Sequence, residues 1–556
     1  MAGRRAAWTV LATGPVLAVS VAAWSQTLEP RVIGTNLSGF TPVSSSWDVA
    51  DLMKASNPWN DGAVSTSTYS ADNWPTFIPS GQSVGTNIRL PVNRLIPNVP
   101  LGTYTVTWDG LGSFTLSSGG GFLQRTNVGP GSATFNVTIP DQQIFFRISG
   151  TSTANPLRNL RILMPGHGPG QVSVGEQFNT TFLDRFGPFK TLRFMDWGST
   201  NSNTMVSWSE RPLPSHRTWT GDRGVPIETM VALANRQLAD PWFNMPVRAD
   251  DQFVRNFATL VRDTLDPRLK VYVEYGNEVW NPQFTAQHDH VRALAVQRYG
   301  SADFWYRTWA EEARRDFAIW REVFGEVGQA DRVVRVAAAQ AVNRFHSPRF
   351  LNHLYSNPSD LNPSGERLFD VLSMGAYLGV PSATYSASTT KDRILDDLLT
   401  DLTRNMNPAL GADGLPVGNF RWNRWLADQH GVPLIAYEGG QHVVPPSATA
   451  SWYTAYVEAQ RDPRMYDVYT ELLRQYLEVL GARGFMNFSS VGSITEFGAW
   501  GVLETGGQDP AAAPKYRALV DYIRRTALVP EPAAVGVWLG LSAMLLKRPR
   551  RAAVAG

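Results

Sequence analysis

Two glutamates, Glu278 and Glu438, each stand at the end of a short apolar run, and their type and placement could support chemistry. Glu278 closes the run Val271-Tyr-Val-Glu-Tyr-Gly-Asn-Glu, and Glu438 closes Pro433-Leu-Ile-Ala-Tyr-Glu. Both runs are typical of a buried strand followed by a turn of small residues. Two carboxyl groups held across one cleft can divide proton transfer and nucleophilic attack between them, which is what breaking a glycosidic bond requires.

The two runs belong to an alternation of strand-like and helix-like stretches, which predicts an α/β fold. Eight strand-like runs can be counted, with Glu278 ending the fourth and Glu438 the seventh. We therefore predict a (β/α)8 TIM barrel, a fold that carries its catalytic side chains at the carboxyl ends of the strands. The runs are residues 31–37, 190–195, 241–246, 271–275, 333–338, 369–374, 433–437 and 484–488, and helices are expected at 47–55 and 250–264.

The pattern changes between about residues 80 and 165, where short alternating runs are separated by turns rich in Gly, Pro, Asn and Ser. Such runs predict an antiparallel, sandwich-like β-domain. We expect this domain to be inserted between the start of the barrel at 26–79 and its remainder at 166–525.

Both ends of the chain carry the features of processing signals. Residues 1–25 have two arginines, an apolar stretch and small residues, the order of a secretory signal peptide, although a buried N-terminal helix is an alternative. Residues 526–556 contain Pro-Glu-Pro, an apolar stretch and a basic terminus, and resemble a PEP-CTERM sorting signal. The apolar stretch at 533–546 would rise only about 21 Å as a helix, which is short for a permanent span, so the alternative of a plain membrane anchor is marginal.

These signals imply export with cleavage by signal peptidase, recognition by a membrane-bound exosortase, and an extracellular or cell-surface location. The membrane would then be contacted only through the C-terminal sorting helix, which could anchor the chain transiently.

The composition excludes several classes of function. The chain has 50 basic and 48 acidic residues without a basic cluster in its main part, so no nucleic-acid partner is expected. It has no cysteine, which excludes disulfides, thiol nucleophiles and thiolate metal sites. No phosphate-binding loop, metal-ligand cluster or serine elbow occurs, so we expect neither a cofactor nor a metal.

The arrangement of Asn277-Glu278 at the fourth strand end, Glu438 at the seventh and Arg193 at the second resembles the clan A glycoside hydrolases, a group of retaining (β/α)8 enzymes. The resemblance implies that Glu278 is the acid/base and Glu438 the nucleophile of a secreted enzyme acting on a polysaccharide or oligosaccharide. It also implies that Arg193 favours the anion of Glu438, that Asn277 holds a sugar 2-hydroxyl, and that Tyr377 orients Glu438.

The chain departs from the clan's common pattern at two positions, which leaves the sugar open. Val279 follows the acid/base glutamate where many members have proline, and Gly375 stands two residues before Tyr377 where parts of the clan have histidine. Trp280 and Trp500 fall at loop positions where an indole face could stack on a pyranose ring.

Each assignment has a structural alternative. Glu274 lies on the same strand face as Glu278 and could be the acid, while Glu438 could be a surface turn residue and Arg193 a structural ion-pair residue. His346 and His442 are expected to be structural, and Asp196 and Asp240 could be rim carboxylates. A non-catalytic, surface-associated glycan- or matrix-binding protein on a barrel scaffold is the alternative function.

Overall fold

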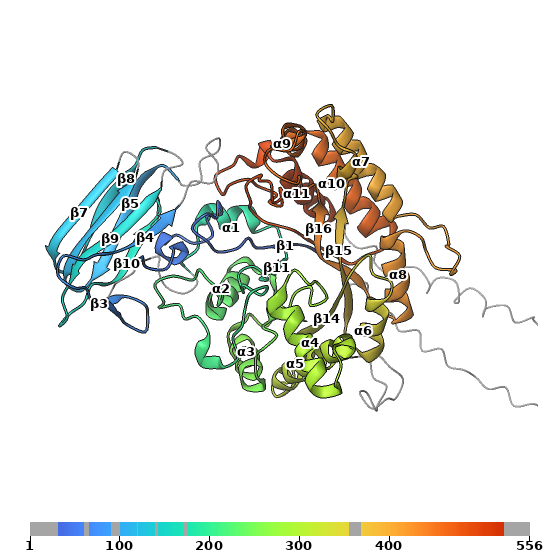
Figure 1. Cartoon of the computed structure of the whole chain (residues 1–556), viewed down its shortest axis with the longest axis horizontal. Coiled ribbons are helices and arrows are strands. Elements are labelled where there is room, and N and C mark those ends of the chain that lie inside the picture. The colour runs from blue at the N-terminus through green and yellow to red at the C-terminus, as the bar shows by residue number, and fades with distance from the viewer. Residues whose placement is uncertain are drawn as a thin grey trace, which may run out of the picture.

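The centre of the computed structural model is a closed barrel of eight parallel strands surrounded by helices (Figure 1). The structure describes residues 32–60, 66–89, 100–118, 121–139, 143–168, 170, 176–354 and 368–527. The barrel strands follow the order of the chain, and the last one closes against the first. The predicted (β/α)8 fold is confirmed. The barrel strands are β1 (Val32–Asn36), β11 (Thr191–Arg193), β12 (Asp240–Met245), β13 (Val271–Tyr275), β14 (Val333–Ala339), β15 (Val371–Leu378), β16 (Leu434–Gln441) and β17 (Gly484–Asn487).

The helices lie outside the barrel and carry the chain from one strand to the next (Figure 1). The predicted helix at 250–264 is α3, which begins after Asp250, whose side chain accepts a hydrogen bond from the Phe253 backbone N–H. The helices are α1 (Thr180–Phe186), α2 (Ile227–Gln237), α3 (Asp251–Thr264), α4 (Thr285–Tyr299), α5 (Trp305–Gly325), α6 (His346–Leu354), α7 (Lys391–Asn405), α8 (Asn419–Gln429), α9 (Tyr453–Arg461), α10 (Arg464–Leu473) and α11 (Pro514–Ala527).

The strand alternation decides which side chains can reach the barrel interior. In β13, Val271 and Val273 belong to the large apolar core that joins the strands to the helices. Tyr272 packs instead with the interior cluster that contains Trp242. Because successive side chains alternate between faces, Glu274 shares the interior face with Tyr272. This strand therefore carries an acidic side chain into the barrel.

Between the first and second barrel strands the chain forms two antiparallel sheets, drawn in cyan beside the barrel (Figure 1). Their inner faces share one apolar core, which includes Val106 of the first sheet and Phe114 and Phe146 of the second. The first sheet contains β5 (Gly102–Asp109), β8 (Gly131–Val137) and β10 (Arg158–Leu163), and the second β4 (Val84–Arg89), β6 (Gly112–Ser118), β7 (Gly121–Val128) and β9 (Ile144–Thr151). A small hairpin of β2 (Thr68–Tyr69) and β3 (Pro75–Phe77) precedes them.

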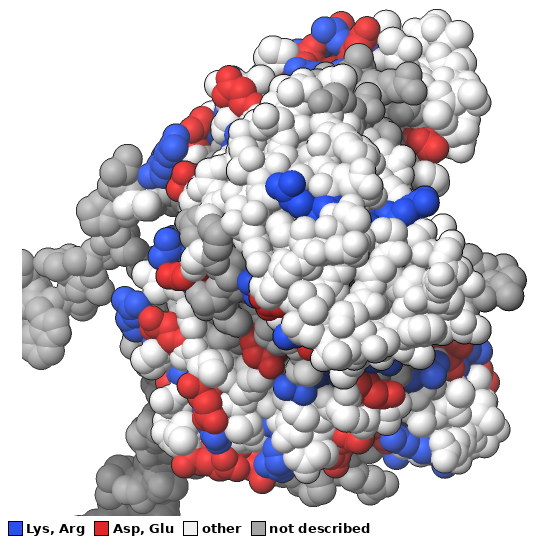
Figure 2. Space-filling view, turned by 90° about the vertical axis from the view of Figure 1, so that its left-hand side faces the viewer, with Lys and Arg blue, Asp and Glu red and all other residues white. Residues whose placement is uncertain are grey.

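Figure 2 views the molecule from the side of these antiparallel sheets, and most of the facing surface is uncharged. The strands there are rich in Ser, Thr, Asn and Gly, as in β5 with the sequence GTYTVTWD.

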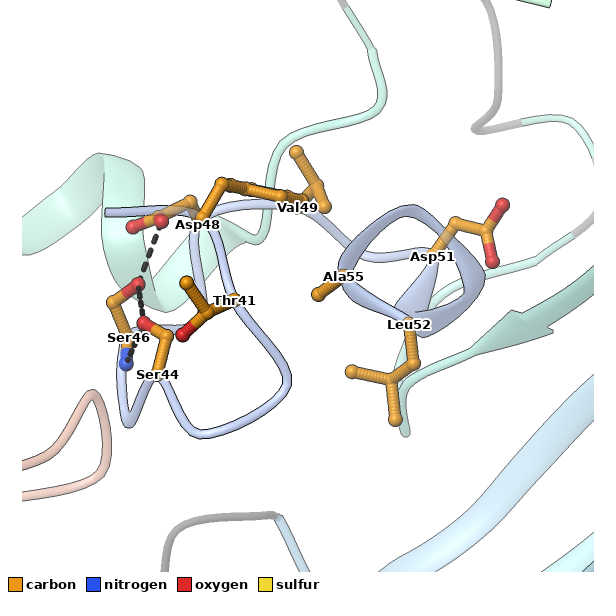
Figure 3. Close-up of a pocket in the computed structure, with 9 residues that line it drawn as sticks. Thr41, Ser44, Ser46, Asp48, Val49, Asp51, Leu52 and Ala55 are labelled. Atoms are coloured by element: carbon orange, nitrogen blue, oxygen red, sulfur yellow. Dashed lines mark hydrogen bonds between the residues drawn. The ribbon is translucent and has the colours of Figure 1, made fainter. Parts of the chain in front are cut away.

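The predicted helix over 47–55 is wrong in its extent, because only a short 3-10 turn, η1 (Leu52–Ala55), forms there. The carboxylate of Asp51 accepts hydrogen bonds from the backbone N–H groups of Met53 and Ile162, so it ties this segment to β10. A second polar chain runs from Ser44 through Ser46 to Asp48 (Figure 3). The contact of Asp51 with the distant strand β10 and the local side-chain hydrogen bonds outweigh the helical pattern.

None of the helices in the part of the chain that the structure describes is long and apolar enough to cross a bilayer. The expected signal peptide at 1–25 and the sorting segment at 526–556 lie outside the described residues, except for the last residues of α11.

Substitution of Gly34 in β1 tests the close packing between neighbouring barrel strands. A Cβ placed on Gly34 would lie 2.5 Å from the backbone oxygen of Thr191 and would also meet the sulfur of Met486. We expect Gly34→Ala to lower the free energy of unfolding by about 1–3 kcal/mol, because the backbone of the neighbouring strand cannot move aside freely. Urea unfolding measures the change.

Gly325→Ala is the matched control. The atom nearest to its added Cβ is the Cβ of Ala330 at 3.9 Å, which is an ordinary contact. Equal stability changes in the two variants would contradict this account of the barrel packing.

Candidate active site

A buried arginine joins four side chains at the carboxyl end of the barrel. Arg193, at the end of β11, is 0% exposed. Its Nη1 donates to Glu438 Oε1 at 2.8 Å and to Asn36 Oδ1 at 2.9 Å. Its Nη2 donates to Glu274 Oε2 at 2.9 Å and to Asn277 Oδ1 at 2.8 Å. Burial opposes the charge of Arg193, but the two carboxylates outweigh it and raise the pKa of Arg193.

Glu438 lies within β16 and is 6% exposed, so it is a buried strand residue and the alternative of a surface turn is wrong. The strand also continues through Gly439 and Gly440, where a turn was expected. One carboxylate oxygen of Glu438 accepts from Arg193, and the other accepts from the Tyr377 hydroxyl at 2.8 Å. A charged and a neutral donor therefore stabilise the anion of this side chain.

Glu278 lies in the turn after β13, where the chain takes left-handed backbone angles at Gly276 and at Glu278 itself, with φ of 64° and 45°. Its Oε1 accepts from the Tyr437 hydroxyl at 2.8 Å, and its Oε2 accepts from Asn281 Nδ2 at 2.9 Å. Burial, assisted by the nearby charge of Glu438, raises the pKa of Glu278 to about 7. Glu278 therefore lies in an environment that favours the protonated acid.

Glu274 occupies a different position from Glu278, below the turn and inside the barrel. It is buried, and its Oε2 accepts from Arg193, from Trp242 Nε1 at 2.9 Å and from Asn244 Nδ2 at 2.8 Å. Its contacts are thus all with buried protein groups, which favours a structural role over that of the acid. Arg193 contacts both Glu274 and Glu438, so the ion-pair alternative and the site assignment for Arg193 are compatible.

Asn277 is buried, and its amide takes part in the same network. Its Oδ1 accepts from Arg193, and its Nδ2 donates one hydrogen to Asn201 Oδ1 at 2.9 Å. Gln287 holds the backbone on both sides, since its Oε1 accepts from the Asn277 N–H and its Nε2 donates to the Asn277 carbonyl. Asn277 is therefore fixed in orientation before any substrate binds.

The two predicted tryptophans lie in different surroundings. Trp500 contacts the rings of Tyr377, His442 and Phe488, with centroid distances of 5.9, 5.0 and 5.7 Å. Trp280 is partly buried and packs against the large apolar core. Of these two tryptophans, Trp500 is thus the one whose ring contacts Tyr377, which donates a hydrogen bond to Glu438.

Several residues of the site had no signal of their own in the sequence. Tyr437, Asn36 and Asn281 are common residue types in strands and loops, and only the fold brings them to the carboxylates. His442, expected to be structural, has its ring beside Tyr377 and Trp500, so it borders the site.

The two possible rim carboxylates lie at opposite ends of the barrel. Asp196 follows Arg193, and burial together with the charge of Glu438 raises its pKa to about 7. Asp240 begins β12 and accepts from the backbone N–H of Lys270, which places it at the amino end, away from the site. His346 packs against Trp305 near α6.

Within the ranges that the structure describes, no group of His, Cys, Asp and Glu side chains is arranged to hold a metal ion. The chemistry that the arrangement supports by itself is that of two carboxyl groups in contrasting environments.

No protein-family model matches the chain, and no curated protein matches it. Solved structures do show similarity. An endo-1,4-beta-D-xylanase from Clostridium thermocellum with CBM22-1 and GH10 modules is 10% identical, with a TM-score of 0.33, over 86% of this chain and 96% of that one. A Thermotoga maritima beta-glucosidase is 11% identical, with a TM-score of 0.34, over 61% of this chain and 84% of that one. A fungal beta-1,4-galactanase is 13% identical, with a TM-score of 0.32, over 62% of this chain and 92% of that one. Similarity at this level assigns neither an activity nor a substrate.

The raised pKa of Glu278 predicts a pH-dependent cost in stability. A carboxyl group whose pKa is higher in the folded state binds more protons there, so the free energy of unfolding falls as the pH rises from about 4.5 to about 7. Glu278→Gln removes this titration. We therefore compare the free energy of unfolding of Glu278→Gln with that of the wild type. We expect the variant's value minus the wild type's value to be about 2 kcal/mol larger at pH 8 than at pH 5.

Urea unfolding of both proteins at the two pH values measures this difference. Hydrogen bonds lost to the substitution affect both pH values equally and cancel. A difference that does not change with pH would contradict the assigned environment of Glu278.

Proposed function

We propose that the protein is a retaining glycoside hydrolase that cleaves a polysaccharide or oligosaccharide by double displacement. The observation that supports this proposal is the contrast between two carboxyl groups at one end of the barrel. Glu438 accepts from a guanidinium and a phenol, which favour its anion, whereas burial raises the pKa of Glu278 to about 7. An anionic nucleophile beside a protonated acid is the pair that a retaining enzyme needs.

In the first step, the Glu438 carboxylate attacks the anomeric carbon while the bond from that carbon to the leaving oxygen breaks. Glu278 gives its proton to the leaving oxygen, so the departing sugar leaves as a neutral alcohol. The product is a glycosyl ester of Glu438. Since esterification removes the negative charge of Glu438, it also removes one cause of the raised pKa of Glu278.

In the second step, Glu278 is ionised and takes a proton from water as the water oxygen attacks the anomeric carbon. The ester bond to Glu438 breaks, its carboxylate is restored, and Glu278 is again protonated. Two displacements at one carbon retain its configuration.

The surrounding residues hold the pair and the sugar. Arg193 and Tyr377 orient the attacking carboxylate, and they stabilise it again when the ester breaks. Asn277 gives one amide hydrogen to Asn201, and its second hydrogen would meet the sugar 2-hydroxyl. Trp500 and Trp280 would provide stacking faces for sugar rings.

The extracellular setting of the proposed reaction rests on the terminal segments. Their sequences favour export with cleavage by signal peptidase, processing by an exosortase, and action on a glycan outside the cell or in its matrix.

Substitution of the two glutamates tests the mechanism. We expect Glu438→Gln to lower kcat/KM by at least about a thousandfold on every substrate that the wild type cleaves, because the amide is a poor nucleophile. We expect Glu278→Gln to lose activity on natural glycans while it still forms the glycosyl ester from dinitrophenyl glycosides, whose leaving group needs no proton. A panel of polysaccharides and aryl glycosides measures both effects.

Nuclear magnetic resonance of the first product reports the anomeric configuration. Inversion, or full activity of Glu438→Gln, would refute the proposal. Binding of a glycan by wild-type protein that cleaves no member of the panel would favour the non-catalytic alternative.

Trp500→Phe tests the stacking face. We expect KM for a polymeric substrate to rise about fivefold because a smaller ring covers less of the sugar. Trp422→Phe in α8 is the matched control, since Trp422 is buried in the apolar core and its indole N–H has no hydrogen-bond partner among the described residues. An unchanged KM in Trp500→Phe would exclude Trp500 from substrate binding.

A further inference from the structure

The strand that carries Glu438 contains a bulge immediately before it. Along the β15–β16 pair, Met374 lies opposite Ala436, but the next residue, Gly375, lies opposite Glu438. Tyr437 is therefore the extra residue and has no partner on β15. A bulge of this kind interrupts the alternation of faces, so two successive side chains can serve one site.

The bulge is held in place by hydrogen bonds from outside the strand pair. The carbonyl of Tyr437 accepts from Asn36 Nδ2 at 2.9 Å, and the oxygen of the same amide accepts from Arg193. The Arg193 guanidinium also lies 5.1 Å from the centre of the Tyr437 ring. The buried Tyr437 ring is thus fixed between the strand and the arginine.

The absence of a side chain at Gly375 makes room for this arrangement. A Cβ at Gly375 would lie 3.5 Å from the Tyr437 hydroxyl and 3.3 Å from the Tyr377 ring. The two phenols therefore meet over Gly375, and each hydroxyl donates to a different glutamate, Tyr437 to Glu278 and Tyr377 to Glu438. A larger residue at position 375 would press first on the Tyr377 ring, since 3.5 Å to the Tyr437 hydroxyl is an ordinary contact.

We infer that Tyr437 is a positioning residue for Glu278, which it holds in place and whose ionised form it stabilises for the second displacement. The inference rests on the proposed function. The Tyr437 hydroxyl can only donate to a carboxylate, because burial and the charges of Glu278 and Glu438 raise the pKa of Tyr437 well above 10.

Charged and titratable groups of the described residues act on Glu278 from three barrel strands. Glu438 from β16 favours its protonated form and Arg193 from β11 favours its ionised form. Tyr377 from β15 and Tyr437 are phenols that stay neutral in the working pH range, and Asn281 is a neutral donor. Loss of the Tyr437 hydroxyl should therefore raise the pKa of Glu278 and favour its protonated form.

The test is the pH profile of kcat/KM for Tyr437→Phe. Since the first displacement needs protonated Glu278, its pKa sets the alkaline limb of the profile. We expect that limb to move to higher pH by about one unit, because the phenylalanine cannot stabilise the anion. A merely structural role would lower activity without moving the limb.

Tyr476→Phe is the matched control, because Tyr476 is buried and its hydroxyl has no hydrogen-bond partner among the described residues. It should leave the profile unchanged. If Tyr437→Phe does not fold, 3-fluorotyrosine at position 437 replaces it, since it keeps the ring and makes the hydroxyl a stronger donor, which should move the same limb to lower pH.

The two possible failures are distinguishable. A wild type that cleaves no glycoside refutes the proposed function. A wild type that is active, with Glu438→Gln inactive and the alkaline limb of folded Tyr437→Phe unmoved, refutes only the role of Tyr437.

Discussion

The site depends on one buried positive charge. Arg193 has no solvent exposure, and a guanidinium in such a place is stable only when carboxylates and other acceptors surround it. The acceptors come from three other parts of the barrel: Asn36 of β1, Glu274 of β13 with the following Asn277, and Glu438 of β16. The ends of these strands are thereby held in one arrangement, and removal of any acceptor would leave a buried donor unpaired.

The charge of Arg193 also makes the electrostatic surroundings of Glu278 and Glu438 different. Glu438 contacts Arg193 directly. Among the described residues, the hydrogen bonds to Glu278 come from the neutral donors Tyr437 and Asn281, and burial raises the pKa of Glu278. Glu274 adds a second negative charge beneath Arg193, so the guanidinium is shared between a structural and a functional carboxylate. Stability and chemistry therefore use the same ion-pair network.

Much of the barrel could be predicted because its strands are buried on both sides and appear as short apolar runs, such as 271–275 and 333–338. Two local predictions failed for the same physical reason. Residues 47–55 have the periodicity of a helix, but Asp51 bonds to β10 instead, and the glycines after Glu438 remain in the strand. In both cases, contacts between distant segments outweigh the local preference.

The order and spacing of apolar runs in the sequence by itself determined the eight strands and the placement of Glu278 after the fourth and Glu438 in the seventh. Arg193 as a neighbour of Glu438 was implied by the resemblance to the clan A glycoside hydrolases. Only the tertiary structure decided that Glu274 accepts from Arg193, that Asn277 is held by Asn201, and that Tyr437 donates to Glu278. A bulge and a hydrogen bond between strands depend on the register of two segments that are far apart in the chain, and neither segment specifies that register alone.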